Sequence, residues 1–441
     1  MNSLAEGDCL KALRRALERE DFQLEKFRTE SLSDSPIGYM GRHLSLIATV
    51  RIGEARRDVR FFVKTPPASG SHLMYLDEMQ HFQKELDVYE TLVPIMTASL
   101  PKGYQLPVPR CFLVKGSSKA GNGEYRRITT EDLLILEDLK EKGYRMYDNM
   151  VPFDLEHCGS LMKSVALLHA PSILLQKTAM DRGKGDNFNY IDGTFRLARD
   201  TLLTNTGGKM QRLGVKSSVE TMTAAVAGLW PDRFGSLNKK KELKERLWKA
   251  WEELSELSKP SRTYTNVLCH GDLWANNIMF KYDDEETSTP ASVVLIDLQL
   301  ARFAPAMTDL LIFFHMSTTR SFREEHMKNL AVTYHNHLRE IVGKDLLDQL
   351  MPLTSFLDSM EEYGLFGKLV ATDWLSFSLN SEDVAPMMEE GGSDGEPPDF
   401  VEKVLKDRGE EVLLNAAANE VYKTRIMESY RECLEHLNLW K

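Results

Sequence analysis

The stretch VLCHGDLWANNIMF, residues 267–280, places polar side chains between two runs of apolar, strand-forming residues. The polar residues are His270, Asp272, Asn276 and Asn277. Polar side chains in such a position either cap a turn or take part in chemistry. The rest of the sequence has to decide between these two interpretations.

The composition is that of an ordinary globular protein and gives no sign of a nucleic-acid partner. The 441 residues, 42% of them hydrophobic and 27% charged, suit two or three domains or one large two-lobed enzyme. The net charge is -11, and the one dense basic run, residues 239–249, is interleaved with glutamate. We interpret this run as the solvated face of a helix and expect no binding to nucleic acid.

Neither a signal peptide nor a membrane span is expected. Residues 1–20 carry charges throughout, while Leu10, Leu13 and Leu17 form a helical stripe, and no run of about 18 uninterrupted apolar residues occurs. The five cysteines are far apart and form no C-x-x-C pair, so we expect reduced thiols and a cytoplasmic location. Cys269, beside His270, is either a thiol nucleophile or a buried residue that ends a strand, and burial is the commoner fate of cysteine.

The first third of the chain has the pattern of a β-rich unit with helices. Residues 39–63 predict a hairpin around the turn GEARRD, and residues 108–116 and 131–139 predict a second pair of strands around a glycine-rich turn. Between these pairs, residues 77–94 predict one helix, whose apolar stripe is Met79, Phe82, Leu86, Tyr89 and Val93.

The remainder of the chain is mostly helical. Residues 153–170 predict a helix that begins at Asp154 and ends before Pro171, and residues 181–260 predict helices with loops. Only 267–280 and 292–300 return to strand, as one hairpin around an acidic turn, and the acidic, Gly/Pro-rich residues 380–400 are interpreted as a mobile loop. We therefore predict an α+β fold with a β-rich N-terminal lobe, residues 1–139, and a large helical C-terminal lobe, residues 140–441.

Two charged residues occupy positions that should be buried. Lys64 ends the strand RFFVK, and Glu85 lies on the apolar face of its helix between Phe82 and Tyr89. Burying either charge costs several kcal/mol unless it finds a partner, so the two side chains are expected to pair with each other. The alternative for each one alone is ordinary exposure to solvent.

An oxygen-rich cluster is predicted around the opening stretch. Asp297 ends the apolar strand SVVLI, while Asp272 and Asn277 lie in the turn before NNIMF. Such a set of oxygens suits Mg²⁺, which takes one or two carboxylates together with phosphate oxygens and water. The chain order of lysine, glutamate, Asp…Asn and a second Asp is that of kinase-type phosphoryl transfer.

These motifs also resemble those of a known family. HGDLWANN, residues 270–277, matches the H-G-D-x-x-x-x-N signature of aminoglycoside phosphotransferases and choline kinases, which have the protein-kinase fold. Together with FVKTPP, ILEDL and IDLQ, it resembles the ecdysteroid-kinase-like, or choline-kinase-like, family from about Gly38 to beyond Asp309. The resemblance implies a bilobal protein-kinase-like fold and a kinase that uses ATP and Mg²⁺.

The resemblance also implies a role for each motif residue. Asp272 would be the catalytic base, Asn277 and Asp297 the metal ligands, and Lys64 the phosphate contact with Glu85 as its partner. Backbone groups of Glu137 and Leu139, at a hinge near residues 137–139, would bind adenine, while His270 and Asp309 would support the catalytic loop.

The sequence departs from the family pattern at two places. Asp297-Leu298-Gln299 stands where the family usually has Asp-Phe-Gln, which keeps an apolar packing residue. The phosphate-covering loop offers Gly38 and Gly41 for ATP binding but no complete G-x-G-x-x-G.

By the same resemblance, the acceptor would be a small-molecule alcohol such as an ecdysteroid-like steroid or a xenobiotic. Trp230, Phe234, Trp248 and Trp251 are candidates for its pocket, although aromatic residues at helical spacing are more often core, and Trp274 either packs under the loop or touches the acceptor. The sequence carries no signal for an oligomeric state.

Two alternatives to a small-molecule kinase remain. A non-catalytic nucleotide-binding or scaffolding protein of the same fold would be expected to lack at least one of Lys64, Asp272, Asn277 and Asp297, all of which are present. A protein kinase would need a longer activation segment than residues 298–308, which include no A-P-E motif.

Overall fold

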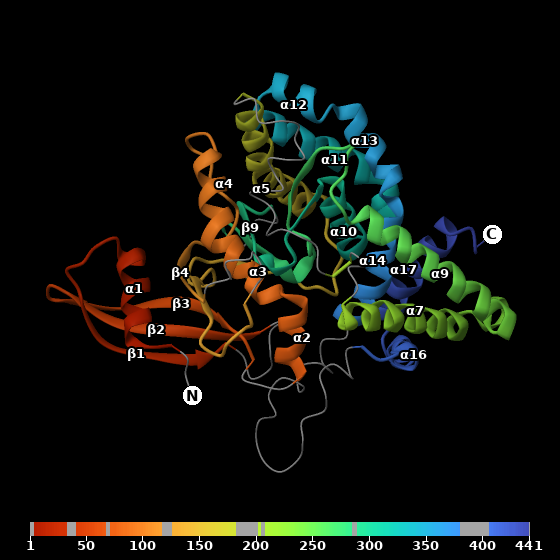
Figure 1. Cartoon of the computed structure of the whole chain (residues 1–441), viewed down its shortest axis with the longest axis horizontal. Coiled ribbons are helices and arrows are strands. Elements are labelled where there is room, and N and C mark those ends of the chain that lie inside the picture. Colours follow the sequence, from red (N-terminus) through yellow and green to blue (C-terminus); the bar gives the residue numbers. More distant parts are fainter. Residues whose placement is uncertain are drawn as a thin grey trace, which may run out of the picture.

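The computed structural model describes residues 4–32, 41–67, 71–116, 126–181, 202–203, 208–284, 289–379 and 405–440. These residues form a β-rich lobe and a larger helical lobe, which lie at the left and the right of Figure 1. The architecture confirms the predicted α+β, protein-kinase-like organisation with two lobes.

The smaller lobe is built on a five-stranded antiparallel sheet with the strand order β1-β2-β3-β5-β4. Its strands are β1 (Gln23–Ser31), β2 (Arg42–Ile52), β3 (Ala55–Thr65), β4 (Cys111–Lys115) and β5 (Leu133–Glu137). The predicted hairpin is β2–β3, but its turn is only Gly53–Glu54, shorter than GEARRD. The second predicted pair is β4–β5, and the turn between them lies largely outside the described residues. The sequence does not predict β1, because its residues QLEKFRTES are mostly polar. In the structure none of them is fully buried.

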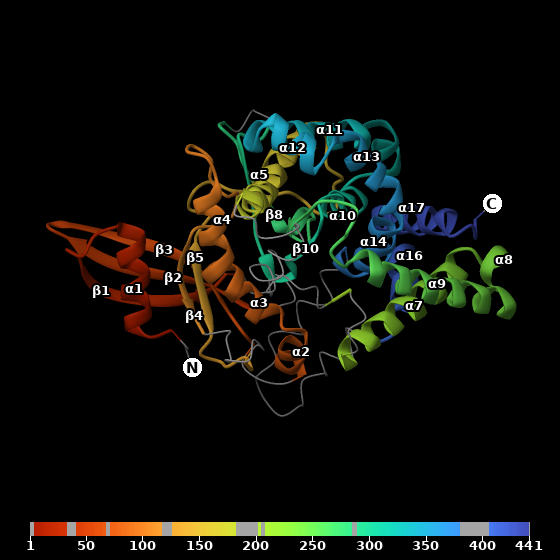
Figure 2. The same ribbon diagram turned by 45° about the horizontal axis from the view of Figure 1, so that its top comes forward.

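The two faces of the sheet pack against different helices. On one face, Val63 and Ile135 join a core with Leu13 of α1 (Glu6–Leu17). Because successive side chains of a strand point to opposite faces, Lys64 lies on the other face, as does Leu134, which belongs to the larger core. Figures 1 and 2 both show α3 and α4 between this sheet and the helical lobe. The strand period therefore directs Lys64 toward the helical lobe.

The single helix predicted over residues 77–94 is wrong, because the segment is broken. It consists of α2 (Ser71–Met79), α3 (His81–Asp87), the π-helical η1 (Val88–Leu92) and α4 (Val93–Ser99). The break lies at Gln80, whose backbone is left-handed with φ of 58°. Spacing along the stripe does not reveal it, since Met79 and Phe82 are buried on both sides of the break.

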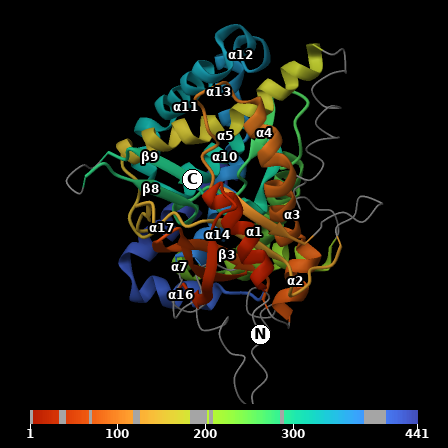
Figure 3. The same ribbon diagram turned by 90° about the vertical axis from the view of Figure 1, so that its left-hand side faces the viewer.

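Helix α5 (Leu155–Asp181) is the central helix of the larger lobe and packs along α11 (Arg320–Val342) (Figure 3). Its start agrees with the prediction, since Asp154 Oδ1 accepts a hydrogen bond from the His157 N–H at 2.9 Å. The predicted end before Pro171 is wrong. Proline removes one helical hydrogen bond, but its neighbours Ala170 and Ser172 are fully buried, and their packing keeps the helix continuous.

By length and composition, α5 is apolar enough to span a membrane. However, 72% of its most apolar 18-residue window is buried inside the protein. A helix that is buried in a protein core is apolar for that reason alone. The composition of α5 therefore gives little reason to place it in a membrane.

Five short strands surround the opening stretch. β6 (Arg145–Met146), β8 (Ile278–Lys281) and β9 (Ser292–Leu295) form one small sheet, while β7 (Asn266–Cys269) pairs with β10 (Arg302–Pro305). The predicted hairpin is β8–β9. The sequence does not predict β10, whose residues RFAP include a charge and a proline. Residues 270–277 thus connect two different sheets.

The other helices complete the larger lobe. They are α7 (Lys209–Leu229), α8 (Pro231–Phe234), α9 (Leu237–Leu257), α10 (Met307–Ser317), α12 (Lys344–Leu350), α13 (Leu353–Glu362), α14 (Gly364–Ser378), α16 (Gly409–Ala418) and α17 (Glu420–His436), with the 3-10 turns η3 (Ala275–Asn277) and η4 (Leu298–Leu300). The basic run 239–249 lies in α9, with Leu243 and Leu247 buried and its lysines largely exposed, as predicted. The predicted mobile loop, residues 380–400, lies outside the described residues.

Candidate active site

Lys64 meets two acids at the junction of the lobes. Its Nζ donates hydrogen bonds to Glu85 Oε2 and to Asp297 Oδ1, each at 2.7 Å, and contacts Gln299 Oε1 at 3.3 Å. The side chains of Lys64 and Glu85 are only 3% and 2% exposed, whereas Asp297 is 24% exposed. The predicted Lys64–Glu85 contact therefore exists, and it includes Asp297.

The electrostatics of this group are those of a buried ion cluster. Burial acts to lower the pKa of Lys64, but the negative charges of Asp297 and Glu85 outweigh it, so that the pKa is raised and the ammonium stays charged. Burial raises the pKa of Glu85, while Lys64 opposes the shift. The second oxygen of Glu85 accepts a hydrogen bond from the Leu298 N–H at 3.2 Å, which ties the helix α3 to the segment after Asp297.

Asp272 and Asn277 lie together in the loop between β7 and β8. Asn277 Nδ2 donates to Asp272 Oδ2 at 2.8 Å and to the Asp272 carbonyl oxygen at 2.8 Å. These bonds leave Asn277 Oδ1 as the amide atom that can ligate a cation. Burial, followed by the charge of Asp297, raises the pKa of Asp272 to about 7. A carboxyl group with such a pKa can accept a proton near neutral pH.

The backbone at Asp297 is held in an unusual conformation. Its φ and ψ are 67° and 74°, a left-handed geometry that non-glycine residues adopt uncommonly and that clusters at functional sites. The carboxylate of Asp297, Asn277 Oδ1 and the nearby Asp272 form a set of hard oxygen donors. This donor set fits Mg²⁺, which binds through few carboxylates. The predicted metal-ligand roles of Asn277 and Asp297 remain predictions.

His270 and Asp309 hold the backbone of the loop between β7 and β8. Asp309 Oδ2 accepts the His270 N–H and Oδ1 accepts the Gly271 N–H, the latter at 2.9 Å, while His270 Nε2 bonds to the Ile296 carbonyl oxygen at 2.8 Å. Gly271 has φ of 84°, and a Cβ there would lie 2.0 Å from the Leu300 carbonyl oxygen. Only glycine fits at this position.

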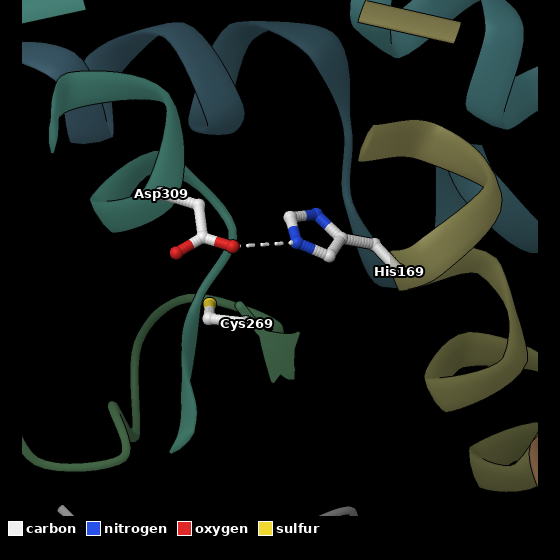
Figure 4. Close-up of side chains that lie close together, drawn as sticks. All are labelled: His169, Cys269 and Asp309. Carbon is white, nitrogen blue, oxygen red and sulfur yellow. Dashed lines mark hydrogen bonds and ion pairs between the residues drawn. The ribbon is translucent and has the colours of Figure 1, made fainter. Parts of the chain in front are cut away.

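The support extends to His169 of α5, which the sequence analysis did not single out. His169 Nε2 lies 3.2 Å from Asp309 Oδ2 (Figure 4). Its Nδ1 lies 2.9 Å from the Tyr334 hydroxyl, and all three side chains are fully buried. The available signal was a histidine on the apolar face of a long helix, which sequence alone cannot distinguish from an isolated core histidine.

His169, Cys269 and Asp309 lie close together and are residue types that can bind a metal ion (Figure 4). The donor atoms of His169, Cys269 and Asp309 lie within 4.8 Å of one another. However, Cys269 Sγ already bonds to the Ala304 carbonyl oxygen at 3.4 Å, and burial raises the pKa of the thiol well above its ordinary value. A protonated thiol is a poor nucleophile, and the side chains of His169 and Asp309 are already hydrogen-bonded to the Tyr334 hydroxyl and to the backbone N–H groups of residues 270 and 271. These residues therefore form a structural hydrogen-bonded network, and Cys269 is a buried strand residue.

Arg302 is a further buried residue of the loop that the sequence analysis did not identify. Its Nη1 donates to the Gly271 carbonyl oxygen at 3.3 Å, and its guanidinium lies 5.0 Å from the centre of the Phe366 ring. Arg302 thus adds a side-chain contact to the backbone of the loop, at the carbonyl of Gly271.

One pocket of about 390 Å³ is lined by all five side chains described above, namely Lys64, Glu85, Asp272, Asn277 and Asp297. Glu137 and Leu139 line it on the side of β5, beside Phe62 and Met279. The Glu137 N–H already donates to the Arg110 carbonyl oxygen, and the Leu139 carbonyl oxygen accepts two hydrogen bonds. Adenine binding would therefore have to use the Glu137 carbonyl and the Leu139 N–H. The predicted adenine contacts are thus reduced to these two backbone groups.

The two predicted phosphate-loop glycines have different outcomes. Gly38 lies outside the described residues. Gly41 does not line the pocket; a Cβ at Gly41 would lie 3.0 Å from the Thr65 carbonyl oxygen and 3.6 Å from the Lys64 side chain. The structure therefore places Gly41 against the strand end that carries Lys64, and its contact with ATP stays a prediction.

The aromatic residues predicted as candidates for an acceptor pocket lie in different places in the structure, and contact with an acceptor stays a prediction. Of the four candidate aromatics, Trp251 lines the pocket, but Trp230 and Phe234 pack against Trp440, and Trp248 packs on the core. Trp274 also lines the pocket. Further lining residues come from the C-terminal third of the chain, where no sequence motif marks them, namely Asp373, Trp374, Ser378, Leu405 and Arg408. These residues come together only through packing of α14 against its neighbours.

The segment after Asp297 is short in the structure as well. It runs through η4 and β10 directly into α10, which begins at Met307. No long segment that could cradle a peptide stands between Asp297 and α10, which argues against the protein-kinase alternative.

Comparison with known proteins places this geometry in a family context. Residues 38–346 match the model of the ecdysteroid kinase-like family, whereas no curated protein matches the sequence. Among solved structures, a choline kinase from Cryptosporidium parvum Iowa II is 14% identical, with 98% of this chain and 96% of that chain covered and a TM-score of 0.43. A Plasmodium vivax ethanolamine kinase is 10% identical, with coverages of 96% and 91% and a TM-score of 0.37. The choline kinase LicA from Streptococcus pneumoniae is 12% identical, with coverages of 94% and 99% and a TM-score of 0.40.

Proposed function

Because the chain belongs to the ecdysteroid kinase-like family, we propose that it is an ATP- and Mg²⁺-dependent phosphotransferase acting on a hydroxyl group of a small molecule. The observation that carries the proposal is the meeting of Lys64, Glu85 and Asp297 with Asp272 and Asn277 in one pocket. These are the residue types that phosphoryl transfer requires for positioning and for charge stabilisation.

In the proposed reaction, Asp272 accepts the proton of the acceptor hydroxyl as that oxygen attacks the γ-phosphorus of ATP. The new oxygen–phosphorus bond forms while the bond from the γ-phosphorus to the bridging oxygen breaks, and ADP leaves. The raised pKa of Asp272 supports its role as a base near neutral pH. Its hydrogen bond from Asn277 fixes the direction of the carboxylate.

Lys64 would hold the phosphates, and Glu85 would hold Lys64. In the structure the Lys64 ammonium bonds to Asp297, so binding of ATP would exchange this contact for phosphate oxygens. Asn277 and Asp297 would hold Mg²⁺, which when bound neutralises charge on the phosphate oxygens. Glu85 keeps its hydrogen bond to Lys64 in this scheme, because both side chains are buried behind Asp297.

For the acceptor, we propose an ecdysteroid-like steroid or a xenobiotic alcohol. The pocket is lined largely by apolar side chains, including Met210, Trp251, Trp274 and Trp374. An apolar wall of this kind suits a molecule with little charge, because burying a charge without a partner is costly.

ATP turnover by the purified chain tests the proposal. The protein is incubated with ATP and Mg²⁺ and with a panel of steroid, phenolic and choline-like alcohols, and both ADP and phosphorylated alcohol are measured. We expect acceptor-dependent ADP formation that is lost in Asp272→Asn. Nucleotide binding without turnover on any alcohol of the panel would instead favour a non-catalytic nucleotide-binding protein.

A further inference from the structure

The acceptor side of the pocket contains an ion pair that phosphoryl transfer does not use. Asp373 of α14 and Arg408, the residue before α16, both line this part of the pocket. Arg408 Nη2 lies 3.6 Å from Asp373 Oδ1, and the two side chains are 8% and 19% exposed. Trp374, Trp251 and Leu405 line the same pocket. A nearly buried ion pair thus stands among apolar residues at the edge of a cavity.

The hydrogen-bonding capacity of Asp373 is only partly used by its neighbours. The Ser218 hydroxyl bonds to Asp373, but its Oγ also lies 3.0 Å from the Gly214 carbonyl oxygen, and its single proton can go to only one of these two acceptors. The 3.6 Å between Arg408 Nη2 and Asp373 Oδ1 exceeds the distance of a direct hydrogen bond. A carboxylate has about four acceptor positions, so Asp373 can accept a further bond from a molecule in the pocket.

The segment that carries Arg408 is firmly held. The Arg408 N–H donates to Thr221 Oγ1 at 2.8 Å, and Ser217 Oγ bonds to the Lys406 carbonyl oxygen. Both anchoring residues belong to α7, which also lines the pocket. The guanidinium therefore starts from a fixed backbone, as a group that selects ligands requires.

The charge of the pair decides which ligand group fits. Asp373 among tryptophans would by itself resemble a site for an organic cation. The adjacent Arg408 cancels that charge and would repel a cation, so a neutral group is favoured. A hydroxyl can donate a hydrogen bond to Asp373 and accept one from Arg408 at the same time, which matches the separation of the pair.

We propose that Asp373 and Arg408 form a second polar subsite of the acceptor pocket, which binds a second hydroxyl group of an otherwise apolar acceptor. The inference rests on the proposed function, because it takes this pocket as the acceptor site. The preferred acceptors are then rigid apolar diols, in which one hydroxyl reaches Asp272 and the other reaches the ion pair.

Matched pairs of alcohols test the subsite in the absence of ATP. The probes are cyclohexanol, decalin-2-ol and bicyclohexyl-4-ol, each compared with its diol, cyclohexane-1,4-diol, decalin-2,6-diol or bicyclohexyl-4,4′-diol. Binding to the full chain is followed by the change in tryptophan fluorescence, since Trp251, Trp274 and Trp374 line the pocket. At the spacing that fits, we expect the diol to bind about 10- to 100-fold more tightly than its partner, as a hydrogen bond to charged groups allows.

The variant Asp373→Leu/Arg408→Met removes both charges together, because removing only one would leave the other buried without its partner. We expect it to bind the single alcohols as the unaltered protein does, while the preference for the diol disappears. Lys216→Gln, a change at the exposed Lys216 of α7 outside the pocket lining, serves as the control and should keep the preference.

Arg408→Met alone should change the preferred ligand from a neutral group to a cation. Asp373 then stands without its cation among the tryptophans, and we expect the variant to gain affinity for tetramethylammonium of about 10-fold or more. The inference is overturned if no diol binds more tightly than its partner to the unaltered protein, or if the folded double variant retains the preference. Because binding is measured without ATP, absence of turnover would contradict the proposed function and leave these results unchanged.

Discussion

Lys64 Nζ donates a hydrogen bond to Asp297 Oδ1 at 2.7 Å, although 233 residues separate the two positions along the chain. One belongs to β3 of the small lobe and the other follows β9 of the large lobe. The contact closes the junction between the lobes at the point where phosphate and metal are expected to bind. It also predicts how the active site responds to changes at either residue.

Asp297→Asn should abolish phosphoryl transfer while the protein remains folded. Asparagine is one of the residues that tolerate the left-handed backbone found at Asp297, so the change removes a charge and a cation ligand without new strain. Turnover at saturating Mg²⁺ and the urea unfolding curve are measured together. Near-normal turnover would exclude Asp297 as a metal ligand. Asp348→Asn, at an exposed position of α12, is the control.

Glu85→Gln and Lys64→Met should show strongly non-additive effects on kcat/KM. In this scheme Glu85 affects the phosphates only through Lys64, because its carboxylate bonds to the Lys64 ammonium at 2.7 Å. Once Lys64 is removed, loss of the Glu85 charge should cost little more, and the double-mutant cycle measures this coupling. Glu90→Gln, an exposed change in η1, provides the control. Strictly additive effects would mean that the two residues act separately.

Asp272→Asn should lower turnover about 10²- to 10⁴-fold, the usual range for general-base assistance, and leave nucleotide affinity largely unchanged. The nucleotide would be held by Lys64 and the β5 end of the pocket, which this change does not touch. If Asp272 were only a turn residue, stability and nucleotide binding would fall together. Nucleotide affinity, melting temperature and turnover measured on this one variant separate the two outcomes.

His169→Phe should lower both stability and kcat, with little change in the KM for ATP. The variant removes the contact to Asp309, whose carboxylate holds the backbone N–H groups of His270 and Gly271. Loss of a buried hydrogen-bond partner costs about 1–3 kcal/mol, which urea unfolding resolves. A purely structural role would lower stability while kcat of the folded enzyme stayed normal. Lys163→Gln, on the exposed side of α5, serves as the control.

His81 should make the protein less stable as the pH falls below about 6.5. Burial lowers the pKa of His81 well below its ordinary value, so below that pH the unfolded chain binds a proton that the folded chain excludes. The contribution to stability is therefore complete above the unfolded pKa and decreases by about 1.4 kcal/mol per pH unit below it. In His81→Phe, the free energy of unfolding in urea should decline less steeply from pH 7 to pH 5. The difference should be about 1.4 kcal/mol for each pH unit below about 6.5. An unchanged slope would show that His81 takes up its proton in the folded protein over the same pH range as in the unfolded chain.

Short-range features of the sequence determined the main elements and the residue types of the site. The β2–β3 hairpin, the start of α5 at Asp154 and the β8–β9 hairpin follow from periodicity and turn residues that act within a few positions. Lys64 and Glu85 were recognisable because a charged residue at an apolar position needs a partner. HGDLWANN and the later Asp297 supplied the order of a kinase site.

Only the tertiary structure decided which of these residues meet and what surrounds them. The break at Gln80, the continuation of α5 through Pro171 and the pairing of β7 with β10 depend on packing between distant segments, which local spacing does not encode. The same holds for the contact of His169 with Asp309 and for the ion pair of Asp373 with Arg408. Each of these residues looks ordinary within its own helix or loop. Its role arises because burial of apolar faces, which is non-directional, brings polar groups from remote parts of the chain into positions where they must satisfy one another.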